Sequence, residues 1–398
     1  MNILMVVPKY PFPVVGGLER QAHELSKSLL RRGHVIHALS SRFDQGQKDT
    51  EIVDGIQIHR IGWIDFSPVR FLLYPFKLSR ILLRLRHEID LIHIHNISWF
   101  GAFVTLFAKA FKIPVITKLP NIGTYGIPGI RRRLFGLLRI VLLKKSDAII
   151  AMTPESLAEL ECIGFPKERV LKVTNGIPLL PPNIRRSRSH LSDSVNAFFV
   201  GRLSQEKGLI DLLYAWHLVK MHVAHPVKLY IIGDGSQKDD LKSLAQSLNL
   251  GNSVEFCGFC ADVSAKLTTA DIFVLPSYAE GNSNAILEAM RAGIPIVSTQ
   301  IGGTAIQVGS KGEHFLIQPG DRKALADRLI ELIKDEMLRL QLGAAMRARI
   351  ENLFSIDRVA AVYEQAYELI LSSRSLQVGQ LNPYIFKRNY SPDNEKLA

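Results

Sequence analysis

The segment Ala197-Phe-Phe-Val-Gly-Arg-Leu-Ser-Gln-Glu-Lys-Gly208 indicates the fold class of this 398-residue chain. An apolar run opens it, a turn with two glycines and two cations follows, and a helical pattern comes next. A short strand that leads through a tight turn into a helix is the unit of an open, doubly wound parallel α/β sheet. In the turn, Arg202 and Lys207 stand beside the free N–H groups of a helix start, which together suit a diphosphate. An ordinary charged surface turn is the alternative for this segment alone.

The same alternation of strand and helix runs through both halves of the chain. Helices are expected between most strands, for example at residues 17–32 and 100–111. Two open sheets suggest a cleft between them, with ligands beyond the carboxyl ends of the strands. Strands are predicted at residues 3–7, 35–40, 56–61, 91–95, 114–117, 148–152 and 170–173, and again at 197–200, 228–232, 254–256, 272–275 and 294–298.

The length of the chain favours two domains, because one ordinary hydrophobic core does not grow to 398 residues. Hydrophobic residues at 47% and charged residues at 22% are typical of a globular enzyme. Pro181-Pro182 and a basic polar run separate the two patterns. The predicted organisation is a first Rossmann-like domain at 1–180, a linker at 181–196, a second at 197–354, a helix at 355–373 able to cross back to the first domain, and an irregular tail at 374–398, which we expect to be disordered.

A second motif, Glu280-Gly-Asn-Ser-Asn-Ala-Ile-Leu-Glu288, follows the strand predicted at 272–275. Its two carboxylates could reach opposite ends of one nucleotide sugar, Glu288 at ribose hydroxyls and Glu280 at a sugar hydroxyl. Between them, residues 281–284 place backbone N–H groups at a helix start, another place for phosphate. On spacing alone this signal is weak, because two Glu on a helix usually mean a solvated face.

With these motifs in view, the second half resembles the donor domain of the retaining glycosyltransferases of family 4, which have the GT-B fold of two facing Rossmann-like domains. The first half agrees through Gly16-Gly17-Leu-Glu-Arg20 in its first strand-to-helix loop. The other residues that carry the resemblance are Gly201-Arg202-Leu203 through Lys207-Gly208, Ile232-Gly-Asp-Gly235, Ala270 to Ser277, Glu280 to Met290, Gly302-Gly303 and Pro319-Gly-Asp321.

The resemblance implies a role for each matching residue. Arg202 and Lys207 would hold the donor diphosphate, Glu288 the ribose and Glu280 the transferred sugar, so that Arg202, Lys207 and Glu280 form the catalytic group. It implies no metal and no cofactor, because the cations and helix starts supply the positive field. The donor-binding residues expected from it are Gly16, Gly17, Gly233, Gly235, Gly281, Asn282, Ser283, Asn284 and Glu288.

The chain departs from the family pattern at two places. Many relatives have a histidine that faces the sugar just after the strand at 114–117, where this chain has Lys118-Leu-Pro-Asn121. Relatives often carry Glu shortly after the double glycine, and in this chain either Gln307 or nothing takes its place. The candidates for acceptor or sugar contacts are Arg20, His95, Lys118 and Asn121.

The expected reaction is transfer of a hexose-type unit from a nucleoside diphosphate sugar to a hydroxyl acceptor with retained anomeric configuration. UDP is the expected nucleotide because it is common in the family. A lipid-linked glycan of bacterial envelope polysaccharide synthesis is the expected acceptor. Two alternatives stay open: a nucleotide-sugar epimerase of the same fold, and a non-catalytic nucleotide-sugar-binding protein.

The formal charge of +12 implies an anionic partner. Basic residues are interleaved with apolar ones at 70–86 and 131–145, as in amphipathic helices that lie on anionic lipid, although solvated helix faces explain the pattern equally well. The expected partners are a nucleoside diphosphate sugar, a glycan or lipid-linked acceptor and an anionic membrane surface, with no nucleic acid.

Several features bear on compartment and metals. No stretch reaches the ~18–20 uninterrupted apolar residues of a membrane span, and the start of the chain lacks the features of a signal peptide. Three cysteines agree with a reducing compartment. We therefore expect a cytoplasmic protein, peripheral on the inner face of the membrane. The pair His93 and His95 and the lone Cys257-Gly-Phe-Cys260 favour packing over metal binding.

Overall fold

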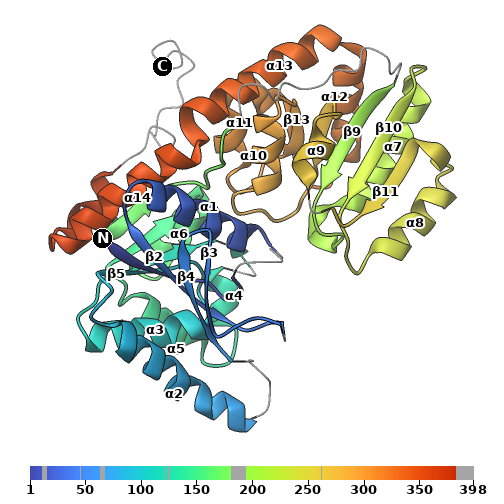
Figure 1. Cartoon of the computed structure of the whole chain (residues 1–398). Coiled ribbons are helices and arrows are strands. Elements are labelled where there is room, and N and C mark those ends of the chain that lie inside the picture. The colour runs from blue at the N-terminus through green and yellow to red at the C-terminus, as the bar shows by residue number, and fades with distance from the viewer. Residues whose placement is uncertain are drawn as a thin grey trace. The chain divides into compact units, whose positions relative to one another are not determined.

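The computed structural model describes residues 1–10, 16–44, 46–62, 68–120, 122–123, 126–180, 194–260 and 262–381. Asn121, one of the candidate sugar-site residues, lies outside these ranges, as does most of the predicted linker. The chain divides into two compact units, shown in Figure 1. The first unit contains Met1–Pro178 and the segment that begins at Ile356, and the second contains Leu179–Ser355.

The first unit is built on an eight-stranded sheet with the order β3-β4-β2-β1-β5-β6-β7-β8. All neighbours pair in parallel except β3 and β4, which form a hairpin. The strand order reverses between β1 and β5, which makes the sheet doubly wound. The strands are β1 (Asn2–Val6), β2 (Val35–Ser41), β3 (Thr50–Val53), β4 (Ile56–Ile61), β5 (Leu91–Ile94), β6 (Val115–Leu119), β7 (Ala148–Ala151) and β8 (Val170–Lys172).

Helices cover both faces of this sheet, as its buried, nearly continuous apolar strands require. The core of one face is shared with α1 and α14, which lie side by side in Figure 1, and the cores of the other face are shared with α2 to α6. The helices are α1 (Gly17–Arg31), α2 (Pro68–Leu85), α3 (Trp99–Ala110), α4 (Ile127–Arg131), α5 (Gly136–Leu143), α6 (Pro154–Cys162) and α14 (Ile356–Leu371).

The helix α14 belongs to the first unit although it follows the whole second unit in the chain. Its Tyr363 and Tyr367 are fully buried in the core beneath it. At its edge, Glu364 accepts from Arg32 at 2.6 Å and pairs with His34 at 2.7 Å. Apolar burial supplies most of the stabilisation of this contact, since such partly exposed ion pairs contribute only ~0–1 kcal/mol.

The second unit has a six-stranded, wholly parallel sheet with the order β11-β10-β9-β12-β13-β14. In sequence order this is the 3-2-1-4-5-6 arrangement of a Rossmann fold, which reverses between β9 and β12. The elements are β9 (Val195–Val200), α7 (Leu209–His222), β10 (Val227–Ile232), α8 (Lys238–Ser247), β11 (Val254–Gly258), α9 (Val263–Leu267), β12 (Ile272–Leu275), α10 (Asn284–Arg291), β13 (Ile296–Thr299), α11 (Thr304–Gly312), β14 (Leu316–Ile317), α12 (Arg322–Lys334) and α13 (Glu336–Arg349).

The structure confirms the α/β class and corrects several details. Strands β3 and β14 are not predicted, because one is an exposed edge hairpin and the other has two residues. Strand β9 starts at Val195, within the range assigned to the linker. The tail is not irregular from its start, because a 3-10 helix at Ser375–Gln380 buries Val378 in the core of the first unit. Within the described ranges, no helix combines the length and apolar character of a membrane span.

Candidate active site

Two loops of the second unit meet where its strand order reverses. One is the turn 201–208 that follows β9, and the other is the loop 276–283 that follows β12. The backbone N–H of Tyr278 donates to the carbonyl oxygen of Glu206 at 2.7 Å, so the loops are hydrogen-bonded to each other. In open α/β sheets this point beyond the carboxyl ends of the strands is where ligands bind.

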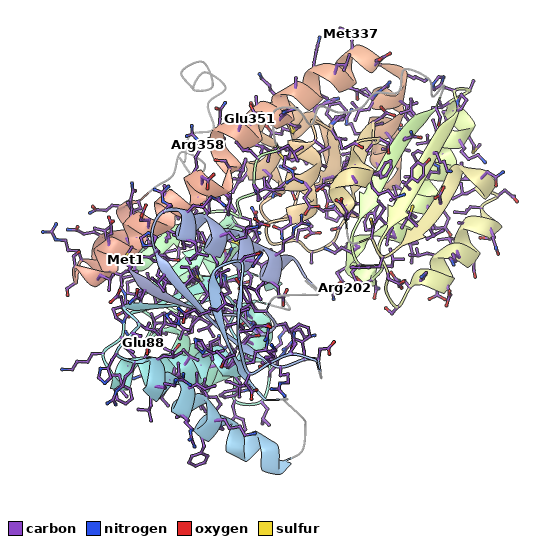
Figure 2. All side chains as sticks on the ribbon, in the orientation of Figure 1. Met1, Glu88, Arg202, Met337, Glu351 and Arg358 are labelled. Carbon is purple, nitrogen blue, oxygen red and sulfur yellow. The ribbon has the colours of Figure 1, made fainter. Side chains whose placement is uncertain are left out.

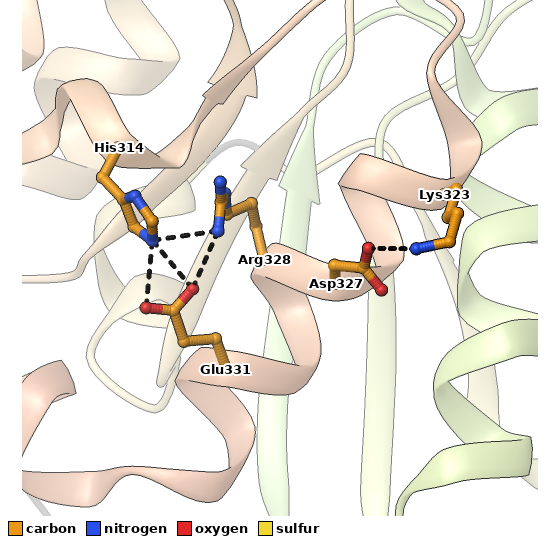
Figure 3. A network of polar contacts seen from close by, with 5 residues as sticks. All are labelled: His314, Lys323, Asp327, Arg328 and Glu331. Atoms are coloured by element: carbon orange, nitrogen blue, oxygen red, sulfur yellow. Dashed lines mark hydrogen bonds and ion pairs between the residues drawn. The ribbon is translucent and has the colours of Figure 1, made fainter.

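A lysine and a carboxylate face each other across these loops. Nζ of Lys207 lies 2.6 Å from Oε1 of Glu280, which also accepts from the hydroxyl of Ser277 at 2.9 Å. The side chains of Lys207 and Glu280 are 19% and 11% exposed, whereas those of Lys323 and Asp327, an ordinary pair on α12 drawn in Figure 3, are 83% and 53% exposed. The Lys207–Glu280 pair is therefore largely removed from water, where charge interactions are stronger.

Arg202 is exposed in the same turn and is labelled in Figure 2. Among the residues that the structure describes, its guanidinium makes no hydrogen bond or ion pair, and its charge acts on the carboxylate of Glu206. An exposed guanidinium beside a largely buried lysine can bind phosphate oxygens without first giving up a partner.

The two glycines Gly233 and Gly235 follow β10 and were predicted to bind donor. A Cβ at Gly233 would lie 1.8 Å from the carbonyl oxygen of Gly201, and one at Gly235 would lie 2.3 Å from that of Leu203. Glycine is required at both positions because the loop packs backbone to backbone against the cationic turn. This packing fixes the turn, and a donor contact at either glycine stays a prediction.

The loop before α10 presents a helix start, as the sequence predicts. Ser283 is the N-cap and its hydroxyl accepts from the backbone N–H of Ile286. Nε2 of Gln307 donates to the carbonyl oxygen of Ser283 at 2.8 Å and to Oδ1 of Asn282 at 3.3 Å. Gly281 accepts from the N–H of Gly303 at 2.7 Å. Gln307, the possible substitute for the family's glutamate, therefore supports the loop that holds Asn282 to Asn284.

Glu288 lies further along α10, in the wall of a cavity of about 340 Å³ between α9 and α10. Its side chain is nearly buried, and Arg291, one turn away, donates to the hydroxyl of Ser264 at 2.6 Å. Asp262 also lines the cavity, whereas Arg202, Lys207 and Glu280 do not. Glu288 therefore lies apart from the Lys207–Glu280 pair. This separation is what is expected if the two places contact different parts of one ligand.

Sequence reasoning missed the polar residues that support this part of the site. Ser264 and Asp262 stand at the start of a helix of five residues, too short for a clear helical pattern. Arg291 could have been found, because residues 288, 291 and 292 share one face of α10 at helical spacing. Ser277 could not, since a serine after a strand is common and only the fold shows that it contacts Glu280.

Some candidates of the first unit lie at the N-terminal end of α1. Gly16 is its N-cap in extended backbone, and Gly17 is exposed in its first turn. Arg20 follows in that turn and donates its N–H to the carbonyl oxygen of Gly16 at 3.2 Å. The helix start is therefore formed as predicted, and its role toward a donor stays a prediction.

The other candidates form a buried polar cluster near the carboxyl ends of β5 and β6. Nζ of Lys118 donates to Oδ1 of Asn175 at 2.7 Å. His95 stacks on His93 at 4.0 Å between ring centroids, and His93 contacts the hydroxyl of Tyr367 at 2.8 Å. Burial lowers the pKa of Lys118 to about 7 and holds the pKa of both histidines well below the ordinary value. His95 is 1% exposed, so its ring lies inside the unit.

Among the described residues, no three His, Cys, Asp or Glu side chains are placed to hold a metal ion together. His93 of β5 and His95, which directly follows that strand, have a tyrosine, a methionine and a lysine as neighbours. The groups present at the switch point, namely a guanidinium, an ammonium, carboxylates and a helix start, suit a nucleotide diphosphate linked to a sugar.

Two doubly wound units, one with cations and carboxylates at its switch point, are the architecture of GT-B glycosyltransferases. Residues 15–179 match the family model described as Glycosyltransferase Family 4, and residues 182–349 match the model described as Glycosyl transferases group 1. The chain therefore belongs to glycosyltransferase family 4. This confirms the predicted family, fold and enzyme class.

Known glycosyltransferases are similar to this chain over most of their length. The N-acetyl-alpha-D-glucosaminyl L-malate synthase of Bacillus anthracis is 26% identical, over 90% of this chain and 96% of its own. The capsular polysaccharide biosynthesis glycosyltransferase CapM of Staphylococcus aureus is 28% identical, over 87% and 96%. The crystal structure of Anabaena HepE in complex with UDP and glucose shares the fold, with a TM-score of 0.74 at 21% identity over 92% of this chain and 99% of that one.

Proposed function

We propose that this glycosyltransferase moves a hexose-type sugar from UDP to a hydroxyl of a lipid-linked glycan, with retention of the anomeric configuration. The observation that carries the proposal is the Lys207–Glu280 pair at the switch point of the second unit, together with Arg202 of the same turn, which is exposed and has no ion-pair partner among the described residues. Lys207 offers a cation for the diphosphate, and Glu280 offers a carboxylate for hydroxyls of the sugar. The two groups are at hydrogen-bonding distance from each other.

The proposed chemistry depends on stabilising the leaving group. The bond between the anomeric carbon and the diphosphate oxygen breaks, and its electrons stay on the diphosphate. Arg202, Lys207 and the start of α10 oppose that growing negative charge. The acceptor oxygen forms the new bond on the same face of the sugar, and its proton goes to a phosphate oxygen of the departing diphosphate. No side-chain nucleophile takes part.

Binding of the donor is divided between two places in the second unit. The sugar would be held by Glu280, whose carboxylate is fixed by Ser277 and Lys207. The ribose would be held by Glu288 in the wall of the cavity between α9 and α10. The relative HepE is crystallised with UDP and glucose, which supports UDP as the nucleotide.

The proposed acceptor is lipid-linked because the first unit carries an exposed surface that is both apolar and basic. On α5 and the turn before it, Leu134, Phe135 and Leu137 are 80%, 64% and 63% exposed. Arg131 to Arg133 and Lys144-Lys145 flank them and are exposed as well. Apolar side chains among cations suit the interface of an anionic membrane. The relative CapM acts in capsular polysaccharide biosynthesis, which supports an envelope glycan as the acceptor.

A donor screen tests the first half of this proposal. The melting temperature of the whole chain is measured with UDP-, GDP- and ADP-sugars, because a ligand at ~100 times its dissociation constant adds roughly 2.7 kcal/mol of stability. We expect the largest shift with a UDP-sugar and none for that ligand in the double variant Arg202→Ala, Lys207→Ala. A larger shift with a GDP- or ADP-sugar would reject UDP.

The configuration of the product tests the second half. Transfer from an α-linked UDP-sugar to a lipid-linked glycan extract should give an α-glycosidic product, identified by the proton coupling of the anomeric centre in NMR spectra. A β-linked product would reject retention. Release of an altered nucleotide sugar without any acceptor would indicate the epimerase instead.

A further inference from the structure

The N-terminal end of α3 lies where β5 ends, in the first unit. Ser98 is its N-cap, and the hydroxyl of Ser98 accepts from the backbone N–H of Gly101 at 3.1 Å while donating to Oδ1 of Asn96 at 2.9 Å. A helix of twelve residues carries a partial positive charge at this end. The end of α3 is therefore an electropositive place even before its neighbours are considered.

A buried guanidinium stands at the same place. Arg139 of α5, a helix that packs against α3, is only 7% exposed. Its Nη2 donates to the carbonyl oxygen of Ile97, and its guanidinium lies 5.8 Å from the ring centroid of Trp99. Its buried Nε–H has no hydrogen-bond partner among the described residues.

The charge of Arg139 is not balanced within the described part of the chain. No carboxylate forms an ion pair with it, and the charged group that acts on it is another cation, Arg133. Burial, and then Arg133, lower the pKa of Arg139. Buried charges in proteins are ordinarily paired, and a cation beside a helix N-terminus is unfavourable. An anion from outside the chain would compensate this charge.

A small cavity of mixed polar and apolar lining lies beside Arg139 and the start of α3. Its volume is about 10 Å³, room for about one water-sized group. Asn96, Ser98, Thr105, Thr117 and Arg139 contribute its polar lining. This volume accommodates a single oxygen atom of a larger anion, such as one oxygen of a phosphate. The exposed Arg131 to Arg133 nearby add further positive charge.

We propose that Arg139 and the N-terminal end of α3 form a phosphate-binding site, which takes a phosphate ester group of the acceptor. The identification of the ligand as part of the acceptor rests on the function proposed above. The site itself does not, because it follows from a buried cation that has no counter-ion among the described residues, from the helix end, and from the cavity that both line.

Calorimetric titration with inorganic phosphate tests the site without any transfer reaction. The full-length chain is used in the background Arg202→Ala, Lys207→Ala, so that phosphate at the donor site does not contribute. We expect Arg139→Gln to weaken phosphate binding by about tenfold or more, the worth of a charge-assisted contact. Arg131→Gln, which removes an exposed cation of the neighbouring helix, is the matched control and should change it less than about twofold.

Two further measurements keep the test decisive. Arg139→Lys retains the charge and should retain part of the binding even where Arg139→Gln proves poorly folded. Phosphate should raise the melting temperature of the parent background but not of Arg139→Gln. No phosphate binding in the parent, or equal loss in Arg139→Gln and Arg131→Gln, would overturn the proposal.

The source of the phosphate is then distinguished by comparing glucose 1-phosphate with undecaprenyl phosphate in detergent micelles. Tighter, Arg139-dependent binding of the polyprenyl phosphate assigns the site to a lipid-linked acceptor. Equal binding of both assigns it to a soluble phosphate ester. The protein could bind phosphate through Arg139 and yet transfer sugar to none of the acceptors tested. That result would support the phosphate site and reject the proposed function.

Discussion

Nζ of Lys207 lies 2.6 Å from Oε1 of Glu280, and this contact joins the turn after β9 to the loop after β12. The two residues are 73 positions apart, yet the parallel sheet brings the ends of their strands together. In the absence of donor each is the counter-ion of the other. A donor that binds here would contact a lysine and a carboxylate already held in place, which lowers the cost of organising the site.

The first prediction concerns the two cations. Lys207→Ala should lower turnover about 100-fold or more, because it removes a charge that stabilises the leaving diphosphate. It should also lower the free energy of unfolding by about 1–3 kcal/mol, since Glu280 loses the ammonium that neutralises it and keeps the hydroxyl of Ser277 as its side-chain partner among the described residues. Arg202→Ala should lower turnover without moving the melting temperature, because Arg202 is exposed. UDP release at saturating donor and thermal melting measure the two effects.

The matched control for this prediction is Lys323→Ala, which breaks the exposed Lys323–Asp327 pair of Figure 3. Both its turnover and its melting temperature should equal those of the parent, because exposed pairs contribute little. Parental turnover in Lys207→Ala and Arg202→Ala would show that the diphosphate binds elsewhere.

The second prediction concerns Glu288. Glu288→Gln should weaken binding of free UDP by about 1.5–3 kcal/mol, roughly 10- to 150-fold, because a neutral amide replaces a charged acceptor of ribose hydroxyls. Calorimetric titration with UDP measures the loss. Glu331→Gln on α12, a partly exposed carboxylate in the network of Figure 3, should leave UDP binding unchanged. Equal affinities in Glu288→Gln and the parent would remove Glu288 from the nucleotide site.

The third prediction concerns the pH dependence that Lys118 imposes. Burial lowers its pKa to about 7 in the folded chain, against about 10.4 in an unfolded one. Between these values the unfolded chain binds a proton that the folded chain does not, so stability rises with pH, by about 1.4 kcal/mol per unit. His93 and His95 have their pKa lowered by burial and stay neutral in this window, and burial raises the pKa of Tyr363 and Tyr367 above it.

Urea unfolding of the parent and of Lys118→Met at pH 7, 8 and 9 measures this slope. The stability of the parent relative to Lys118→Met should rise by about 1.4 kcal/mol per pH unit, because the methionine lacks the titration. Lys144→Met, which removes an exposed lysine of the same unit, should run parallel to the parent. Parallel curves for Lys118→Met would mean that Lys118 is charged in the folded chain.

Much of this architecture could be predicted because parallel strands bury both faces and give uninterrupted apolar runs. The cationic turn and the carboxylate pair are local in sequence, so their position after strands could be predicted too. The Lys207–Glu280 contact could not, because it depends on which strands become neighbours. Arg139 is the clearest failure of local reasoning: it lies in a basic stretch expected to face solvent or lipid, yet it is buried while Leu137 of the same helix is 63% exposed.

The last prediction concerns the exposed apolar and basic surface of α5. Each cation near an anionic bilayer contributes about 1 kcal/mol, so Arg131 to Arg133 with Lys144 and Lys145 could hold the protein there, and Leu134 and Phe135 could enter the interface. We expect the protein to float with vesicles that contain anionic lipid and not with neutral ones. Binding should weaken as salt rises, because charge is screened within ~10 Å at 0.1 M salt.

Two triple variants distinguish the effect of this particular surface on membrane binding from the effect of net charge alone. Changing Arg131, Arg132 and Arg133 to Glu should abolish flotation with anionic vesicles. Changing Lys220, Lys242 and Lys266 to Glu alters the net charge equally on exposed positions of the second unit and should leave most of the flotation. Phe135→Ser should weaken binding at high salt most, where the apolar contribution dominates. Two results would contradict this prediction: equal recovery on anionic and neutral vesicles, or equal loss of binding in the two triple variants. Either result would show that α5 is an ordinary solvated helix and would favour a soluble acceptor.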